Sequence, residues 1–432
     1  MRREAIWEYL RGALWALPSL AVVLALLAGS LLTLVEVSPD STFGHLLFQG
    51  TADDARTLLI AIASTMATVI ALVLGLSVVA LQLSSTQFSP RLLRNFLRDR
   101  HNQVVISVFV ATFAYSTAGL YTVGISQGTR TEDYARLAVT GALFLLFVSL
   151  VTLVYFLHHV AHSIQIDEIM SKVERATLTV IERDLPPDAT TAALPDPPAW
   201  AVLVPAYRSG YVQTMHPEVL RDVATGLDAV VHVVPMLGEH VIAESPLLWA
   251  WRSSPEQPPP APEEFAGAAH DAIRVGFERT AEQDVAFGIR QLADIGVKAL
   301  SPAINDPYTS IQAVEHIAVL LAALAQRRLG NQQLHDADGA VRVAIPGRDL
   351  TYYLDLATGQ MRRYGAAEPR VIRALLRVLR NTSTFCQTDA DREAVAFQVR
   401  LVREAAETAI RQLADLAPVR DFADQVLREV TG

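Results

Sequence analysis

The sequence predicts an α-helical membrane protein with four transmembrane helices and a cytoplasmic α+β domain, in which a small β region precedes a mainly helical region. Hydrophobic residues make up 51% of the 432 residues and charged residues only 19%, whereas soluble proteins average about 25% charged residues. Residues 1–162 hold ten Lys and Arg against nine Asp and Glu, and residues 163–432 hold 26 against 36. A nearly neutral apolar third therefore precedes an acidic, more polar remainder.

This composition excludes several classes of protein. An acidic soluble part repels phosphate, so a general nucleic-acid binder is excluded. A single cysteine, Cys386, excludes a disulfide framework and any zinc site built from several cysteines.

Four stretches without Asp, Glu, Lys or Arg are long enough to cross a bilayer, which takes about 20 helical residues. Backbone groups in lipid must be satisfied within the segment, so each stretch is predicted to be a helix. The stretches are Ala13–Val35, Leu58–Leu81, Val104–Val123 and Leu137–Leu157.

The loops between these stretches predict the orientation. Arginines gather before the first stretch, at Arg2, Arg3 and Arg11, and between the second and third, at Arg91, Arg94, Arg98 and Arg100. The positive-inside rule then places both termini in the cytoplasm of a multi-pass protein of the bacterial inner membrane. The acidic remainder is expected in the cytoplasm too.

Proline clusters divide that remainder. A helical stalk continuing from the fourth stretch is expected over 163–183, a proline-rich linker over 184–199, a small β subdomain over 200–252, a second linker over 253–264, and a mainly helical domain over 265–432. The four-helix transmembrane domain takes 1–162. Strands are expected at Ala201–Tyr207, Tyr211–Met215, Ala229–Val234, His240–Ala243, Leu247–Trp251 and Ala340–Ile345. Helices are expected over about 265–300, 307–328, 367–381 and 390–415, with a short last helix.

The segment after the second stretch predicts an amphipathic helix. Ser89 can cap it and Pro90 can occupy its first turn. Arg91, Arg94 and Arg98 then share one face. This pattern is typical of a topology signal that meets anionic lipid headgroups. It also fits a ring of arginines at the mouth of an oligomeric pore.

The second stretch carries small and hydroxyl-bearing residues at helical spacing: Ser64, Thr68, Ala71, Gly75 and Gln82. Such residues usually let membrane helices pack closely. The same stripe is compatible with the water-facing wall of a pore, so both interpretations stay open.

His158 and His162 are four residues apart, share a helix face at the membrane boundary, and are weak candidates for a divalent-metal site. Interfacial histidines that hydrogen-bond a lipid or a neighbouring helix are an equally simple interpretation. No metal-ligand motif supports a metal site.

The richest polar stretch, 278–308, is a candidate ligand loop. Its candidate residues are Arg279, Glu282, Asp284, Arg290, Ser301, Asn305 and Asp306. Ser301-Pro302 and Asp306-Pro307 both have the pattern of an N-cap followed by a first-turn proline, and a helix start attracts anions. Structural capping alone also explains the pattern.

The sequence contains no Walker loop, dinucleotide fingerprint, nucleophile elbow or metal-ligand run. No catalytic residue and no cofactor are therefore expected, and an enzyme, such as a membrane hydrolase, ranks behind the two functions given below.

Several motifs resemble an uncharacterised bacterial family of predicted integral membrane proteins, domain of unknown function 2254. They are VALQLSSTQFSPRLLRNF at 79–96, YFLHHVAHS at 155–163, SGYVQ at 209–213, RTAEQDVAFGIRQLAD at 279–294 and ALSPAINDP at 299–307. The resemblance spans nearly the whole chain and implies a membrane location. It implies no activity, substrate or catalytic residue.

Two functions fit these observations. The first is a homo-oligomeric channel or transport-type protein, with the lipid bilayer, anionic headgroups and further copies of the chain as partners. The alternative is a membrane-anchored ligand-binding, sensor or scaffold protein. The absence of charges within the spans disfavours ion-coupled transport and leaves a passive pore open.

Overall fold

The computed structural model describes residues 15–32, 47–87, 100–123, 134–163, 165–187, 192–252, 254, 256 and 258–432. The chain divides into two compact units, Met1–Glu168 and Ile169–Gly432, and each is described by itself. The predicted arginine helix at 91–100, with Arg91, Arg94 and Arg98, lies almost entirely outside the described residues.

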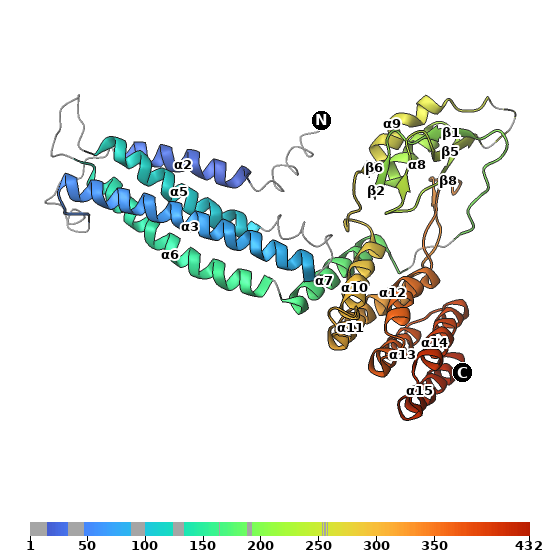
Figure 1. Ribbon diagram of the computed structural model, residues 1–432. Helices are drawn as coiled ribbons and strands as arrows, with labels where there is room; N and C mark the ends of the chain where they lie inside the picture. Colours follow the sequence, from blue (N-terminus) through green and yellow to red (C-terminus); the bar gives the residue numbers. More distant parts are fainter. Residues whose placement is uncertain are drawn as a thin grey trace. The chain divides into compact units, whose positions relative to one another are not determined.

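The described residues of the first unit form a bundle of four apolar helices (Figure 1): α2 (Ala16–Leu32), α3 (Ala52–Gln87), α5 (Arg100–Thr122) and α6 (Arg136–Ser163). The helix α5 packs against each of the other three. Between α5 and α6, the hydroxyls of Thr112 and Ser149 lie 2.9 Å apart, and the Tyr115 hydroxyl donates to the Ala138 carbonyl at 3.0 Å. These three buried side chains are thus paired inside the bundle, as an apolar surrounding favours.

Four helices are long and apolar enough to cross a membrane: Ala52–Gln82, Arg100–Tyr121, Arg136–His162 and Pro307–Ala325. The first three match predicted spans, and α2 is shorter over its 17 described residues. The fourth belongs to α11 (Pro307–Ala325), which packs in the second unit between α10 (Val285–Ala299) and α13 (Pro369–Ser383). A helix that is apolar nearly all round and packed on both sides is typical of a protein core.

The expected continuous stalk is interrupted. The helix α6 ends at Ser163 and α7 (Ile166–Asp184) begins after Gln165. The helix α7 buries Met170, Val173 and Val180 along one face, so it behaves as part of the second unit's core over most of its length.

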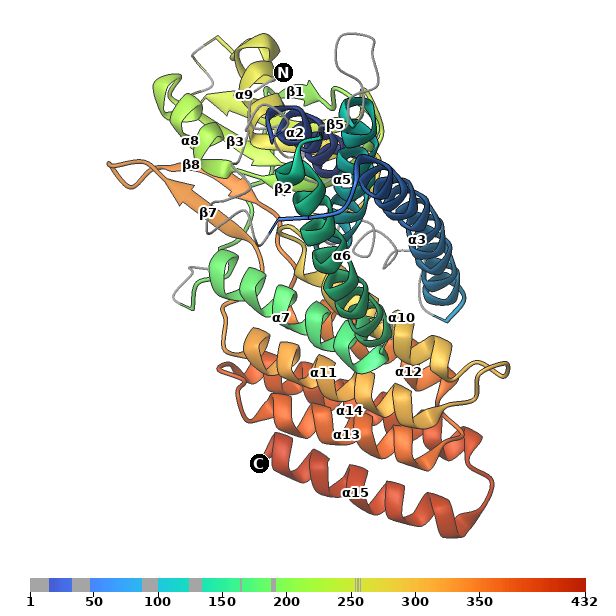
Figure 2. The same cartoon turned by 90° about the vertical axis from the view of Figure 1, so that its left-hand side faces the viewer.

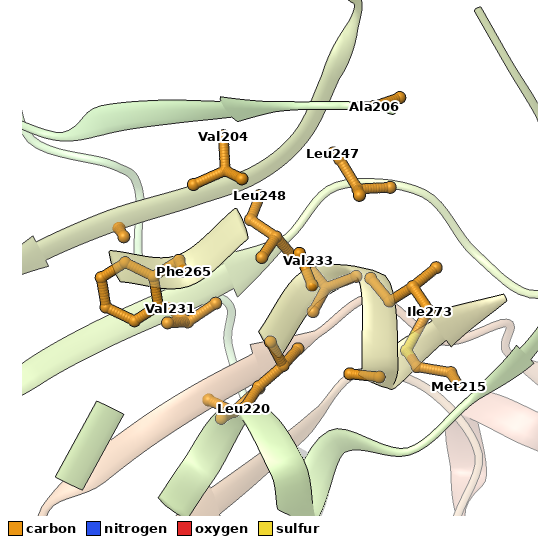
Figure 3. Packing of buried hydrophobic residues seen from close by; sticks show 14 of the residues in the cluster. Val204, Ala206, Met215, Leu220, Val231, Val233, Leu247, Leu248, Phe265 and Ile273 are labelled. Atoms are coloured by element: carbon orange, nitrogen blue, oxygen red, sulfur yellow. The ribbon is translucent and has the colours of Figure 1, made fainter. Parts of the chain in front are cut away.

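The β part of the second unit holds two sheets. The larger has the strand order β1 (Val202–Pro205), β5 (Pro246–Arg252), β3 (Ala229–Val233), β8 (Val341–Ile345), β7 (Gln332–His335). The smaller has the order β4 (His240–Val241), β2 (Gly210–Met215), β6 (Ile273–Gly276). Their shared core also includes α8 (Pro217–Gly226) and α9 (Pro262–Ala272), with Leu220, Val233, Leu248, Phe265 and Ile273 fully buried (Figure 3).

The pairing of β3 with β8 is parallel, with Val231 opposite Val343, whereas the other strand pairs are antiparallel. Arg342 supports it, because its guanidinium donates to Asp336 at 2.6 Å and to Asp228 at 2.8 Å. This pair brings residues 341–348 next to the β region at 229–233. The β region therefore extends well beyond residue 252.

The helical part consists of α10, α11, α12 (Leu350–Tyr364), α13, α14 (Asp389–Ala409) and α15 (Leu413–Thr431), stacked in roughly parallel rows with α7 (Figure 2). The predicted single helix over 265–300 is wrong: α9, β6 and α10 replace it, because residues 273–276 pair with β2. The prediction missed α8 and α12, and α15 has 19 residues instead of being short.

Gly288 of α10 lies against Thr177 of α7, and a Cβ at Gly288 would overlap the threonine side chain. Gly267 of α9 is a helical glycine with no atom near the place of its Cβ. Replacing a helical glycine by alanine usually stabilises by about 0.5–1 kcal/mol, while overpacking a core costs about 1–3 kcal/mol.

We therefore expect Gly288→Ala to lower the free energy of unfolding and Gly267→Ala to raise it. Urea unfolding of the full chain in detergent micelles, followed by tryptophan fluorescence, measures both. Equal effects of the two substitutions would contradict the packing of α7 on α10.

Candidate functional site

A buried carboxylate organises the junction of the β part and the helical part of the second unit. Asp284 caps α10, because its side chain accepts the backbone N–H of Phe287 at 3.1 Å. Only 1% of the Asp284 side chain is exposed. A buried carboxylate needs charged or hydrogen-bonding partners to be stable.

Arg279 is the main partner of Asp284. Its Nε donates to one carboxylate oxygen and its Nη2 to the other at 3.1 Å, while the guanidinium lies 5.5 Å from the centre of the Phe287 ring. Gly238, with φ +77°, packs so closely that a Cβ there would overlap the Asp284 carboxylate. The loop after β3 therefore needs glycine to approach this ion pair.

A second arginine approaches the same carboxylate from the segment before α12. The Nη1 of Arg348 lies 3.9 Å from the Asp284 Oδ1, and its guanidinium stacks 4.9 Å from the centre of the Tyr352 ring. Only 9% of the Arg348 side chain is exposed. Its Nε is buried and has no hydrogen-bond partner among the described residues.

These groups border a cavity of about 130 Å³. Its wall comes from the end of α7, the end of β2, the loop after β3, the start of α10, the segment after α11 and the segment from β8 to α12. The lining residues are Asp184, Leu185, Met215, Met236, Leu237, Gln283, Asp284, Val285, Leu329, Gly330, Gln332, Ile345, Pro346, Gly347, Arg348 and Tyr353. A mostly apolar wall with a few converging polar groups is typical of a small-molecule site.

The charges at the cavity do not cancel. Asp184 pairs with Arg183 at 2.7 Å, and Asp284 pairs with Arg279. Burial raises the pKa of the Tyr353 phenol, so that group stays neutral at physiological pH. Arg348 is left as one positive charge in excess.

Beside the cavity, the structure brings together two of the predicted loop residues, Arg279 and Asp284. Glu282 instead pairs with Arg274, and Arg290 pairs with Asp294 along α10 at 3.3 Å. These pairs are more exposed and lie outside the cavity wall.

Ser301, Asn305 and Asp306 follow the opposite end of α10, whose 15 residues span about 22 Å. Asp306 accepts the Thr309 N–H at 3.2 Å and the Thr309 hydroxyl at 2.6 Å, which lowers the pKa of Asp306. The Asn305 N–H donates to the Ser301 carbonyl at 2.8 Å. These are the contacts of a helix cap, and a ligand at this loop stays a prediction.

Sequence reasoning missed Gly238, Arg348 and Tyr353. The segment Pro346-Gly347-Arg348-Asp349 has the pattern of a turn before a capped helix, and Asp349 is the N-cap of α12. The pattern carries no sign of Arg348 approaching Asp284, which depends on the pairing of β8 with β3.

The stripe on α3 faces away from the other described helices of its unit. Ser64, Thr68, Ala71, Gly75 and Gln82 are exposed, and no described atom lies within 4 Å of the place of a Cβ at Gly75. The Thr68 hydroxyl donates to the Ser64 carbonyl at 3.1 Å. The stripe therefore does not serve packing among the described helices of one chain.

His158 and His162 lie with ring centres 4.1 Å apart, and the His162 Nδ1 lies 3.0 Å from the His158 carbonyl oxygen. Across the part of the chain that the structure describes, no group of three or more His, Cys, Asp or Glu is placed to hold a metal ion. A metal site at this pair stays a prediction.

The chain belongs to the family described as "Predicted membrane protein (DUF2254)", whose model matches residues 11–381. It is 42% identical over 423 residues to an uncharacterised protein of Mycobacterium bovis and to one of Mycobacterium tuberculosis. Each match covers 97% of this chain and 81% of the relative. No solved structure matches the chain. The family confirms the prediction of a membrane protein, and the described residues contain four helices that are long and apolar enough to cross a membrane.

Asp284 and Asp306 form a matched pair, because both cap a helix and, of the two, the buried Asp284 also forms an ion pair, with Arg279. Losing an N-cap costs about 0.5–2 kcal/mol, whereas removing one partner of a buried ion pair costs about 3–5 kcal/mol.

We expect Asp284→Ala to reduce the free energy of unfolding by the larger amount and Asp306→Ala by the smaller. Urea unfolding of the full chain in micelles, followed by the fluorescence of Trp249 and Trp251, reports the stability of the second unit. Equal losses in the free energy of unfolding would contradict a stabilising role of the pairing between Asp284 and Arg279.

Proposed function

We propose that the protein is a membrane-anchored ligand-binding protein whose second unit senses a small molecule in the cavity at Arg348. One observation carries the proposal: a buried guanidinium with an unpaired Nε forms part of the wall of a mostly apolar cavity. A buried donor without an acceptor costs about 1–3 kcal/mol. A ligand that supplies the acceptor recovers that cost.

The connection of the cavity to the membrane domain supports a sensor rather than a simple binding protein. Asp184 and Leu185, at the end of α7, form part of the cavity wall. The helix α7 is fixed to the helical part by the contact of Thr177 with Gly288 and by a 2.6 Å hydrogen bond between Glu174 and His316. Along the chain, α7 follows the last span. A ligand that contacts the end of α7 therefore biases the helix through which the two units are joined.

The proposal places both termini and the second unit in the cytoplasm of an inner-membrane protein. Its support is the excess of arginine in the loops 1–12 and 82–103 over the other two loops. Arg91, Arg94 and Arg98 then face the cytoplasmic leaflet, where anionic headgroups attract them.

The sensing function is tested by filling the cavity. Leu237→Trp places a larger side chain in the wall, and Ile242→Trp is the matched control, because Ile242 is 64% exposed and lies outside the wall. A ligand at 100 times its dissociation constant stabilises the bound protein by about 2.7 kcal/mol.

We expect compounds of a broad metabolite library to raise the unfolding temperature of the wild type and of Ile242→Trp, and to leave that of Leu237→Trp unchanged. The measurement uses the full chain in lipid nanodiscs. A library without any stabilising compound, or with equal stabilisation of Leu237→Trp, would contradict the proposal.

A homo-oligomeric channel is the second candidate, and the outward-facing stripe on α3 favours it. A four-helix bundle fills its interior with side chains, here Leu59, Phe109 and Phe156 among others. A conducting path would therefore lie between copies of the chain, with the stripe as its wall.

The channel is tested electrically. Purified protein in a planar bilayer should pass current, and Ser64→Leu or Thr68→Leu should reduce it by making the wall apolar. Leu72→Ile, on the same exposed part of α3, is the control that should conduct as the wild type does. Silent bilayers under voltage and tension would reject the channel.

A further inference from the structure

We infer that the cavity at Arg348 selects a small molecule with one carboxylate group and a compact apolar body. The inference rests on the proposed ligand-binding function and names the class of ligand. It follows from three properties of the cavity: the acceptor that Arg348 lacks, the charge at the wall, and the size and polarity of the remaining wall.

Asp284 accepts no hydrogen bond from the Arg348 Nη1. Its two oxygens already receive Arg279 and the Phe287 N–H, and the Arg348 Nη1 stays at 3.9 Å, beyond hydrogen-bond distance. Arg348 is a residue of the cavity wall, and its buried Nε has no hydrogen-bond partner among the described residues. Two parallel hydrogen bonds to one carboxylate are the arrangement that a guanidinium favours most.

The charge at the wall favours a single negative charge on the ligand. The two carboxylates of the wall, Asp184 and Asp284, are each paired with an arginine behind the wall, Arg183 and Arg279, so Arg348 is the wall charge that lacks a close partner. A monocarboxylate cancels it. A dianion leaves one uncompensated negative charge, and a cation adds a second positive charge, and both are costly in a mostly apolar cavity.

The rest of the wall sets the body of the ligand. Met215, Met236, Leu237, Leu329 and Ile345 contribute apolar side chains. The volume of about 130 Å³ is below the ~300–1,000 Å³ that drug-sized ligands occupy. Short aliphatic acids fit these limits, whereas nucleotides exceed both the volume and the charge.

The test measures binding of named probes to the full chain in phosphatidylcholine nanodiscs by titration calorimetry. The probes are hexanoate, its neutral isostere hexanamide, hexylamine and inorganic phosphate. We expect hexanoate to bind about tenfold or more tightly than each of the others, because only hexanoate forms charge-assisted hydrogen bonds and fills the apolar wall.

Variants assign the effect to Arg348. Arg348→Gln should weaken hexanoate binding about tenfold or more, and Arg348→Lys should give an intermediate loss, because it keeps the charge without the planar fork. Arg380→Gln is the matched control, since Arg380 also stacks on an aromatic ring, at 5.6 Å from the Phe422 centre, and is not a residue of the cavity wall. It should bind as the wild type does. Unfolding curves without probe identify any variant that fails to fold, and Arg348→Lys then serves in place of Arg348→Gln.

Equal binding of hexanoate and hexanamide, tighter binding of phosphate, or unchanged binding by a folded Arg348 variant would overturn the inference. If hexanoate fails while library compounds still stabilise the wild type and not Leu237→Trp, the ligand class is wrong and the proposed function stands. If neither hexanoate nor any library compound acts, both are wrong.

Discussion

The buried carboxylate of Asp284 is the interaction on which the second unit depends most. It starts α10, neutralises Arg279, approaches Arg348 and packs against Gly238. These residues come from three segments that lie far apart in the sequence. A charge this deeply buried is stable only when its partners are fixed, so it holds the three segments in one arrangement. The cavity exists because that arrangement leaves space beside the ion pair.

The membrane part of the fold was predictable because its signal is local. An uncharged apolar stretch of sufficient length has only one stable solution in a bilayer, and α3, α5 and α6 match their predicted spans. The second unit was less predictable because its boundaries depend on long-range pairing. Residues 273–276 continue a helical pattern, yet they form β6 because β2 offers them backbone partners. The parallel pair of β3 and β8 joins segments more than 100 residues apart, and no local pattern indicates it.

The candidate site, too, was predictable only where its contacts are local in the sequence. Arg279 and Asp284 were predicted as part of one polar loop, and their five-residue separation lets them pair within a single turn before α10. The same run of polar residues includes Ser301, Asn305 and Asp306. These three residues lie at the other end of the helix α10, which separates them from Asp284. Arg348 was not predicted, since it reaches Asp284 only after β8 joins the larger sheet and α12 packs on α10.

The position of the cavity connects these observations to the membrane. Its wall combines the end of α7 with the segment between β8 and α12, so a bound molecule would contact both the helix that follows the last span and the arginine that has no acceptor. If the wall of the cavity came from the helical part alone, a bound ligand would stabilise only that part. Here the energy that a ligand gains at Arg348 also depends on where Leu185 and Asp184 lie. Under the proposed sensing function, linkage requires that a change of α7 which lowers ligand affinity be opposed by ligand binding to the same extent.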